Sequence, residues 1–238
     1  MSTILSIEGV HAGYGRIEVL HGLTMDVPRG SVVAVLGPNG AGKTTALRAI
    51  SGSLPVTLGR VLLDGRRIDN RRPSTIARRG LVLVPEGRGV FGGMTVEENL
   101  RISHRSAAAD VAGPWDAWFE RITATFPRLG ERRNQTAGSL SGGEQQMLAL
   151  CRAMVGEPGV VMVDELSMGL APLIVDMLFE QIADLRDQGR TIVLVEQYLT
   201  HALRYADLCY ILGKGKVVWC GEPAELRSSE AAASFLGV

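Results

Sequence analysis

The sequence predicts an α/β protein with a parallel-sheet core, an N-terminal antiparallel β subdomain and an inserted α-helical subdomain. Four short apolar runs predict the core strands: Ser31–Leu36, Leu81–Val84, Val160–Val163 and Thr191–Val195. Near-continuous apolar runs are typical of strands that are covered on both faces. Helical patterns separate these runs, and this alternation indicates an α/β fold.

The helices of the core follow from the segments between the strands. Helical patterns cover Lys43–Ser51, Glu144–Val155 and Leu173–Gln188. The last pattern stops before Gly189, and glycine is the residue that most often ends a helix.

Two regions depart from the alternation. Ile4–Asp26 and Arg60–Ile68 contain short alternating strands and turn signals such as Asp64-Gly65, which predict the antiparallel subdomain. Thr95–Gly138 lacks good strands and contains Pro114 and Pro127. We therefore expect it to be a helical insertion between two core strands.

Composition narrows the class of protein. The 238 residues carry 25 basic and 25 acidic side chains, so a whole-chain nucleic-acid footprint is not expected. Seven arginines between Arg60 and Arg79 are interpreted as a solvated face in preference to a nucleic-acid site. No apolar run approaches the ~20 residues of a membrane span, and no secretory signal is visible. The three cysteines fit a reducing cytosol better than a disulfide framework.

The strongest motif is a glycine-rich loop between a strand and a helix. GPNGAGKT fits the phosphate-loop pattern at every fixed position, and the expected nucleotide-binding residues are Gly37, Pro38, Asn39, Gly40, Ala41, Gly42, Lys43, Thr44 and Thr45. Its backbone N–H groups and the helix N-terminus favour phosphate. Only three lysines occur against 22 arginines, so Lys43 is expected to supply a compact charge that arginine cannot. Thr44 is expected to bind Mg²⁺ through its hydroxyl.

A second motif complements the loop. In VVMVDE, an apolar strand places Asp164 and Glu165 at its carboxyl end. Asp164 is expected to hold Mg²⁺, and Glu165 is expected to polarise a water in line with the γ-phosphate of a bound nucleotide. These two motifs alone would also fit a kinase, a GTPase or a helicase. Two acidic residues after a strand are common in ordinary turns. They indicate a metal-binding and catalytic site here because the phosphate loop is present in the same chain.

A third motif, LSGGEQQ at Leu140–Gln146, precedes a helix and resembles the signature of ATP-binding-cassette (ABC) ATPases. Ser141, Gly142 and Gly143 would offer a hydroxyl and backbone N–H groups to phosphate. The resemblance implies a head-to-tail pair of ATPase subunits, in which each signature faces the ATP of the other subunit. It also implies a P-loop NTPase (RecA-like) core.

The resemblance covers essentially the whole chain. It places Tyr14 against adenine, Val84–Leu100 in the loop between the Mg²⁺ site and the helical subdomain, and Ser167–Pro172 in an intersubunit loop. It implies one ABC ATPase domain over 1–238, with a nucleotide-binding core at 1–94 and 157–238 and a helical subdomain at 95–156.

Several residues depart from the general family pattern. Glu86 replaces a glutamine near the metal, Gln197 replaces the switch histidine, and Ala171 replaces an aspartate. These departures resemble the LivF-type ATPases of branched-chain (hydrophobic) amino acid importers. Leu166 and Gly89 differ even from that subclass, which normally has proline and arginine there.

The resemblance implies an Mg²⁺-dependent ATPase with Glu165, Gln197 and Glu86 as catalytic residues and Thr44, Asp164 and Glu86 as metal ligands. The expected partners are a membrane permease, a second ATPase subunit (identical or different) and, indirectly, an extracellular or periplasmic solute-binding protein, but no nucleic acid. The expected location is the cytoplasmic face of the membrane. A urea or short-amide importer ATPase, a soluble non-transport ABC ATPase and a non-hydrolysing regulator remain alternatives.

Two smaller questions stay open in the sequence. His201 lies four residues after Gln197 and could serve as the switch, although a solvated helix position is favoured. Trp115, Trp118 and Phe119 form an apolar stripe. The stripe fits a packed subdomain core, or a groove for a permease helix.

Overall fold

The structure is a computed structural model that describes residues 2–87, 89–107, 113–196 and 199–228. Its strands are β1 (Thr3–Tyr14), β2 (Ile17–Pro28), β3 (Val32–Leu36), β4 (Val56–Leu63), β5 (Arg66–Arg67), β6 (Leu81–Val84), β7 (Val160–Asp164), β8 (Thr191–Val195), β9 (Leu208–Gly213) and β10 (Lys216–Gly221). Its helices are α1 (Lys43–Ile50), α2 (Pro73–Arg78), α3 (Val96–Ser106), α5 (Trp115–Thr125), α6 (Pro127–Glu131), α7 (Gly142–Met154), α8 (Pro172–Asp187), α9 (Leu199–Tyr205) and α10 (Pro223–Ser228), with a 3-10 turn η1 (Ala137–Ser139).

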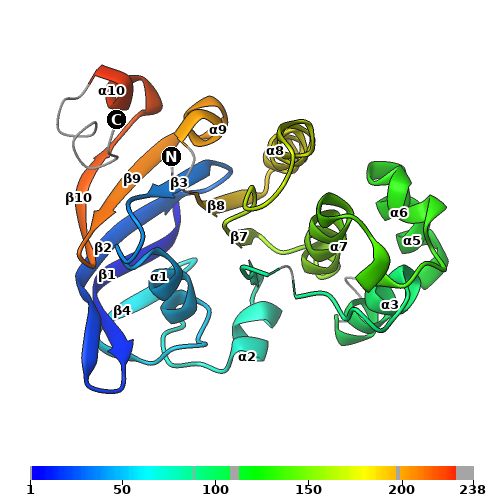
Figure 1. Ribbon diagram of the computed structural model, residues 1–238. Helices are drawn as coiled ribbons and strands as arrows, with labels where there is room; N and C mark the ends of the chain where they lie inside the picture. The colour runs from blue at the N-terminus through cyan, green and yellow to red at the C-terminus, as the bar shows by residue number, and fades with distance from the viewer. Residues whose placement is uncertain (1, 88, 108–112, 197–198, 229–238) are drawn as a thin grey trace.

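Two sheets form the body of the molecule (Figure 1). The larger sheet has the order β10-β9-β3-β8-β7-β6, and only the β9–β10 pair is antiparallel. The smaller sheet, β2-β1-β4-β5, is antiparallel throughout. The four predicted core strands and the predicted antiparallel subdomain are therefore confirmed. The sequence did not predict the β9–β10 hairpin, which extends the large sheet.

The alternation of β3 explains how the large sheet is covered. Val33 and Val35 join a core shared with α1 and the small sheet. Ala34 and Leu36 face a small cluster with Leu226 of α10. Because apolar partners cover both faces, the strand is an unbroken apolar run and all five of its residues are buried.

The inserted segment between β6 and β7 is helical, as predicted. It contains α3, α5, α6, η1 and α7, which lie to one side of the sheets (Figure 1). Trp118 and Phe119 are only 2% and 8% exposed, and Trp115 packs against their cluster. The guanidinium group of Arg101 lies over the ring of Trp115, and the ring of His104 meets that ring edge to face. The packed-core interpretation of this aromatic stripe is therefore confirmed.

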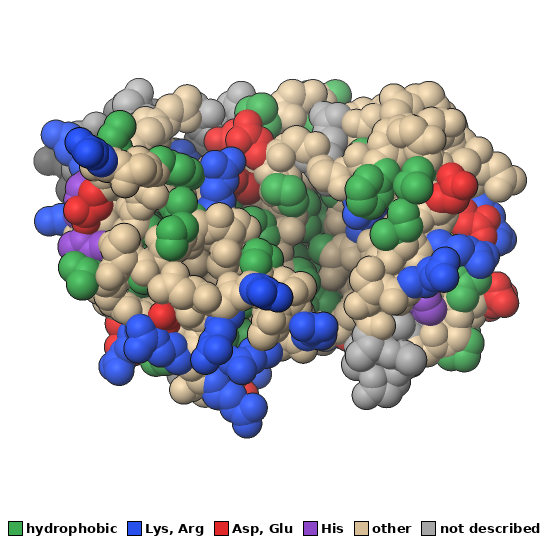
Figure 2. All heavy atoms as spheres, turned by 90° about the horizontal axis from the view of Figure 1, so that it is seen from below, with side chains coloured by type: hydrophobic (Ala, Val, Ile, Leu, Met, Phe, Trp, Pro, Cys, Tyr) green, Lys and Arg blue, Asp and Glu red, His purple; other side chains and the backbone are tan. Residues whose placement is uncertain are grey.

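The arginine-rich segment lies on β4, β5 and α2. Its seven arginines are exposed, and Figure 2 shows blue side chains gathered along one part of the face seen from below. Arg60 pairs with Glu8, and Arg67 pairs with Asp69.

In the described ranges, no helix is both long and apolar enough to cross a bilayer.

Candidate nucleotide-binding site

The phosphate loop connects β3 to α1 and packs against the β9–β10 hairpin. Gly37 has a φ of +143°, and a Cβ there would lie 2.4 Å from the carbonyl oxygen of Leu212. The N–H of Gly215 in the hairpin turn donates to the carbonyl of Ala41 at 2.9 Å. Only glycine fits at position 37, because any side chain would meet this backbone.

The first turn of α1 is open to an anion. Its N-cap, Gly42, has a φ of +103° and offers no side chain to accept from the first N–H groups. No acidic residue lies in this turn. Because the first four N–H groups of a helix lack intrahelical partners, they remain available to phosphate oxygens.

Lys43 is held inside the loop. The residue is only 5% exposed, and its Nζ donates to the carbonyl oxygens of Gly37 at 2.8 Å and Pro38 at 3.2 Å. Burial lowers the pKa of Lys43, while the negative charges of Glu165, Asp164 and Glu196 act in the opposite direction. The ammonium group therefore makes only two neutral hydrogen bonds in the described structure, which phosphate oxygens can replace.

Asp164 and Thr44 meet at the end of β7. The Oγ1 of Thr44 donates to Oδ1 of Asp164 at 3.3 Å, and Asp164 is 3% exposed. Burial raises the pKa of Asp164 to about 6, with Glu165 and Glu86 adding to the rise and the Thr44 hydrogen bond opposing it. A buried carboxylate beside two other acids is a place where a cation is favoured.

Glu165 reaches the same pocket. A hollow of about 320 Å³ is lined by Val19, Asn39, Gly40, Gly42, Lys43, Thr44, Thr45 and Glu165. Glu165 has a left-handed backbone, with a φ of +50°, and it is partly buried. Two motifs about 120 residues apart in the chain thus meet at the carboxyl end of the parallel strands, where α/β sheets commonly bind ligands.

Other predicted residues lie outside the lining of that hollow. Tyr14 is 43% exposed at the end of β1, and its hydroxyl accepts from Nη1 of Arg48 at 3.1 Å. Glu86 is exposed just beyond β6 and acts on Asp164 through its charge. A larger hollow of about 500 Å³ lies between α9 and α10, away from the phosphate loop.

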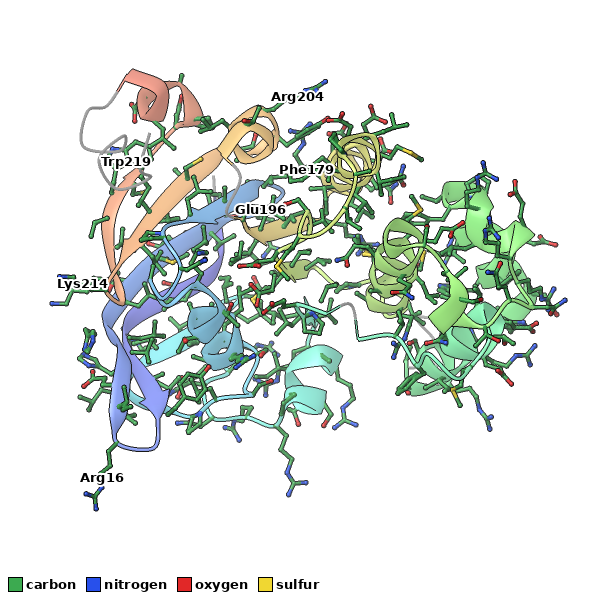
Figure 3. All side chains as sticks on the ribbon, viewed as in Figure 1. Arg16, Phe179, Glu196, Arg204, Lys214 and Trp219 are labelled. Carbon is green, nitrogen blue, oxygen red and sulfur yellow. The ribbon has the colours of Figure 1, made fainter. Side chains whose placement is uncertain are left out.

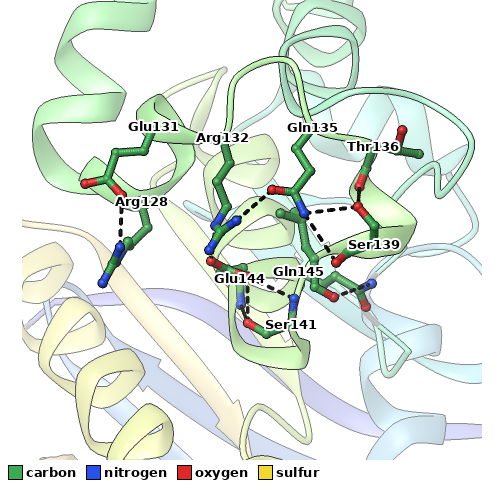
Figure 4. A network of polar contacts seen from close by, with 10 residues as sticks. Arg128, Glu131, Arg132, Gln135, Thr136, Ser139, Ser141, Glu144 and Gln145 are labelled. Carbon is green, nitrogen blue, oxygen red and sulfur yellow. Dashed lines mark hydrogen bonds and ion pairs between the residues drawn. The ribbon is translucent and has the colours of Figure 1, made fainter.

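The signature residues form a separate site at the start of α7 (Figure 4). Ser141 is the N-cap: its N–H donates to Oε2 of Glu144 at 2.9 Å, and its hydroxyl donates to the same oxygen at 2.8 Å. The hydroxyl also accepts from the N–H of Glu144, which completes a capping box. Glu144 pairs with Arg132 at 2.5 Å. Despite partial burial, these hydrogen bonds and this ion pair lower the pKa of Glu144.

Gly143 has a packing role in addition to the expected phosphate contact. A Cβ at this position would lie 2.2 Å from Cγ2 of Ile174 on α8. The glycine leaves room for the side chain of Ile174 beside the first turn of α7, so a side chain at position 143 would have to displace Ile174.

Two residues near the site were not predicted from the sequence, and the two switch candidates fall wholly or partly outside the described residues. Gln197 lies outside the described residues, as does the side chain of His201, so the choice between them as switch stays a prediction. Sequence reasoning missed Val19 in the pocket wall and Glu196, which is 1% exposed at the end of β8. A charged residue directly after a buried apolar strand was the available signal for Glu196.

Comparison with known proteins decides the family. Residues 20–167 match the family described as ABC transporter. The chain is 41% identical over 215 residues to the high-affinity branched-chain amino acid transport ATP-binding protein BraG of Pseudomonas aeruginosa, covering 90% of this chain and 91% of the relative. The chain belongs to the ABC transporter family.

Other members of the ABC transporter family agree with this assignment. The probable branched-chain amino acid transport ATP-binding protein LivF of Archaeoglobus fulgidus is 38% identical, with 93% of each chain covered. The ADP conformation of an ATP-binding cassette of an ABC transporter superimposes with a TM-score of 0.84 at 26% identity, covering 99% of this chain and 98% of that one. The chain is thus an ATP-binding ABC ATPase subunit, and such a subunit implies membrane permease partners in a transporter complex.

Proposed function

We propose that the chain hydrolyses ATP to power the uptake of branched-chain or other hydrophobic amino acids through a separate membrane permease. The observation that carries the ATPase part is the meeting of Lys43 and Glu165 in one pocket. The substrate class is supported by the two relatives above, both of which are branched-chain amino acid transport proteins.

ATP phosphate groups bind to the backbone of residues 37–42 and to the first turn of α1. Lys43 exchanges its bonds to the Gly37 and Pro38 carbonyls for phosphate oxygens. Thr45 and Asn39 line the same hollow. Tyr14, which Arg48 holds through its hydroxyl, stacks on the adenine.

Mg²⁺ fits the oxygen atoms beside this pocket. Thr44 and Asp164 supply a hydroxyl and a carboxylate, and Glu86 adds a further negative charge. No group of three His, Cys, Asp or Glu side chains suited to a metal exists in the described part of the chain. The ion therefore requires phosphate oxygens as well, as is usual for Mg²⁺ with nucleotides. When bound, Mg²⁺ neutralises phosphate charge.

Hydrolysis depends on Glu165 as general base. Its carboxylate accepts a proton from a water molecule, the water oxygen bonds to the γ-phosphorus, and the bond from that phosphorus to the bridging oxygen breaks to release ADP. Glu86 and Gln197 sense the γ-phosphate and its water.

The working form is a head-to-tail pair of ATPase subunits, identical or different. Ser141, Gly142 and Gly143 face the ATP of the partner. One chain that binds one nucleotide through its phosphate loop does not need a second phosphate-binding site for that nucleotide. The Ser167–Pro172 loop lies between the subunits. The nucleotide-binding core comprises 1–94 and 157–238, and 95–156 carry the signature.

The subunit works at the cytoplasmic face of the membrane, beside the permease. A solute-binding protein contacts it only indirectly, and no nucleic acid is involved. An importer of urea or short amides is the alternative within the same subclass, and a soluble ABC ATPase is the alternative outside transport.

Replacement of the base tests the ATPase proposal. In Glu165→Gln, phosphate release should fall by roughly 10²- to 10⁴-fold, because proton transfer to a positioned base supplies about that factor. ATP affinity should persist, since Lys43 and Asp164 are unchanged, and the variant should accumulate as an ATP-bound dimer in size-exclusion chromatography. Glu180→Gln, the same change at an exposed residue of α8, is the control and should match the parent. Near-parental turnover in Glu165→Gln would contradict the role of Glu165.

The substrate needs its own assay. The chain is co-expressed with its permease and solute-binding protein in vesicles, and ATP-dependent uptake of radiolabelled leucine, isoleucine and valine is compared with uptake of urea. Uptake of urea alone would favour the alternative importer, and failure to associate with any permease would favour the soluble ATPase.

A further inference from the structure

Glu196 is a buried acid with defined contacts near the site. It follows β8 directly and lies in the interior of the molecule (Figure 3). Its Oε1 accepts from the N–H of Ser167 at 3.1 Å, and its Oε2 accepts from the hydroxyl of Ser167 at 2.6 Å. Ser167 is itself only 5% exposed. Both carboxylate oxygens therefore hold one residue of the segment after β7.

That segment contains a strained turn. Glu165 has a φ of +50°, a left-handed conformation that costs free energy in a residue with a side chain. Such a conformation persists where the surrounding structure fixes it on both sides. On the near side, the N–H of Glu165 donates to the carbonyl of Val195 at 2.9 Å.

The far side of the turn is fixed by Leu166 and Ser167. Leu166 is 1% exposed within the core beneath α7 and α8. Ser167 makes its two bonds to Glu196. Val195 and Glu196, at the end of β8, thus hydrogen-bond to Glu165 itself and to Ser167 beyond it. Hydrogen bonds to an ionised carboxylate are stronger than those between neutral groups, so the contact between Glu196 and Ser167 restricts movement of the turn.

We propose that Glu196 is a positioning residue for hydrolysis: through Ser167 it holds the turn that presents the Glu165 carboxylate to the attacking water. This inference rests on the proposed role of Glu165 as general base. It assigns to the Glu196–Ser167 pair a function in the rate of the chemical step, and none in holding ATP.

The charge of Glu196 allows an effect on ATP affinity to be distinguished from an effect on the hydrolysis rate. Glu196 adds negative charge around Lys43, together with Asp164 and Glu165. ATP is an anion, so neutralising Glu196 should not weaken ATP binding and should slightly strengthen it. Loss of a positioning contact should at the same time slow hydrolysis. A damaged fold would instead weaken both binding and turnover.

The experiment measures the ATP dissociation constant and the single-turnover hydrolysis rate of the full-length chain with Mg²⁺. In Glu196→Gln the charge-assisted bond to the Ser167 hydroxyl is lost. We expect hydrolysis to fall by about 10- to 100-fold, the range that a displacement of roughly 1 Å produces, with an unchanged or tighter dissociation constant. Ser167→Ala, a milder change, should lower the rate by several-fold. The double variant should be no slower than Glu196→Gln, because both changes break one contact.

Two controls match these variants at sites away from the pocket. Ser31→Ala removes a buried serine whose hydroxyl donates to the Pro28 carbonyl at 2.7 Å. Asp69→Asn neutralises a buried acid that accepts from the Val61 N–H. Both should keep the parental hydrolysis rate. Amide hydrogen exchange of peptides covering residues 165–170 should quicken in Glu196→Gln and stay unchanged in the controls.

The outcomes separate the two proposals. If Glu165→Gln loses hydrolysis while Glu196→Gln and Ser167→Ala stay within about twofold of the parent, the positioning role is wrong and the general base stands. Parallel losses of affinity and rate, or fully additive effects in the double variant, also overturn the positioning role. If Glu165→Gln itself hydrolyses ATP at the parental rate, the failure belongs to the proposed function.

Discussion

Two helix N-termini of this protein carry the motifs that we propose to bind phosphate, and they are built in opposite ways. The first turn of α1 follows a glycine N-cap without a side-chain cap and contains no acid. The first turn of α7 has a serine N-cap and a glutamate that closes a capping box. Glu144 is further bound to Arg132 in the network of Figure 4.

The two helix N-termini differ in how fully their own polar groups are satisfied in the described structure. Around α1, the hydrogen bonds of buried Lys43 to described residues are both to neutral carbonyl groups, and buried Asp164 has a raised pKa. The fold therefore tolerates charges that a nucleotide and its metal can neutralise. At α7, Glu144 satisfies the N–H of Ser141, and the Ser141 hydroxyl satisfies the N–H of Glu144. The signature turn is therefore stable without nucleotide, and it presents chiefly the N–H groups of its two glycines.

Among the tests of this comparison between α1 and α7, the largest effect is expected when the compact cation at the start of α1 is replaced by a planar one. Lys43→Arg keeps the charge, but a planar guanidinium is larger than the ammonium that fits between the loop carbonyls. Overpacking such a site typically costs about 1–3 kcal/mol, so ATP affinity should fall by roughly 10- to 100-fold, with turnover falling as well. Titration with a fluorescent ATP analogue measures the affinity.

The matched control is Lys214→Arg, the same change at an exposed turn residue. It should leave affinity and turnover at the parental values. If Lys43→Arg also keeps both, charge alone is sufficient, and the shape-based contrast between the two helix N-termini fails.

Local signals in the sequence were enough for much of this architecture. The run Leu81–Val84 and the run Thr191–Val195 are strands with the predicted bounds, because strands covered on both faces are apolar at nearly every position. Every residue of β8 is buried, whereas the two central residues of β6, the edge strand, are half-buried. The phosphate loop was predictable because its pattern lies within eight consecutive residues. The ABC signature was recognisable for the same reason.

Features that depend on contacts between distant segments could not be predicted. The β9–β10 hairpin was missed, and its contact with Gly37 exists only once β9 lies beside β3. The hydrogen bonds between Glu196 and Ser167 join residues 29 positions apart. The clash that keeps Gly143 a glycine comes from Ile174 on another helix. None of these relations leaves a periodic pattern in the chain.

A smaller effect, opposite in sign for stability and function, is expected at Asp164. Its pKa rises from 3.8 to about 6 on folding. The folded chain therefore binds the proton more tightly than the unfolded chain, so the free energy of unfolding falls as pH rises from about 4 to about 6 and stays lower above that. Two pKa units correspond to roughly 3 kcal/mol, so Asp164→Asn should gain about 1–3 kcal/mol at pH 7.5 without nucleotide and Mg²⁺.

Urea unfolding at pH 7.5 and at pH 4 measures this gain, which should shrink at the lower pH. The same variant should lose Mg²⁺-dependent turnover. Asp184→Asn, at an exposed position of α8, should change the unfolding free energy by less than about 0.5 kcal/mol at both pH values. A destabilised Asp164→Asn at pH 7.5 would mean that the apo fold needs this charge, contrary to the comparison.

The smallest change in the free energy of unfolding is expected at the N-cap of α7. Comparing this change with the change in the rate of ATP hydrolysis distinguishes a helix-capping role of Ser141 from a role in the nucleotide site. Ser141→Ala removes an N-cap and should lower the free energy of unfolding by about 1 kcal/mol. Helix α3 supplies a matched control, because Thr95 and Glu98 form the same capping box at its start. Thr95→Ala should cost a similar amount, but only Ser141→Ala should also slow ATP hydrolysis, since only Ser141 belongs to the signature. Urea unfolding and phosphate release measure the two quantities. Equal slowing in both variants would assign the loss to helix stability and remove Ser141 from the nucleotide site, whereas unequal slowing at equal stability would leave contact with the partner's ATP as its role.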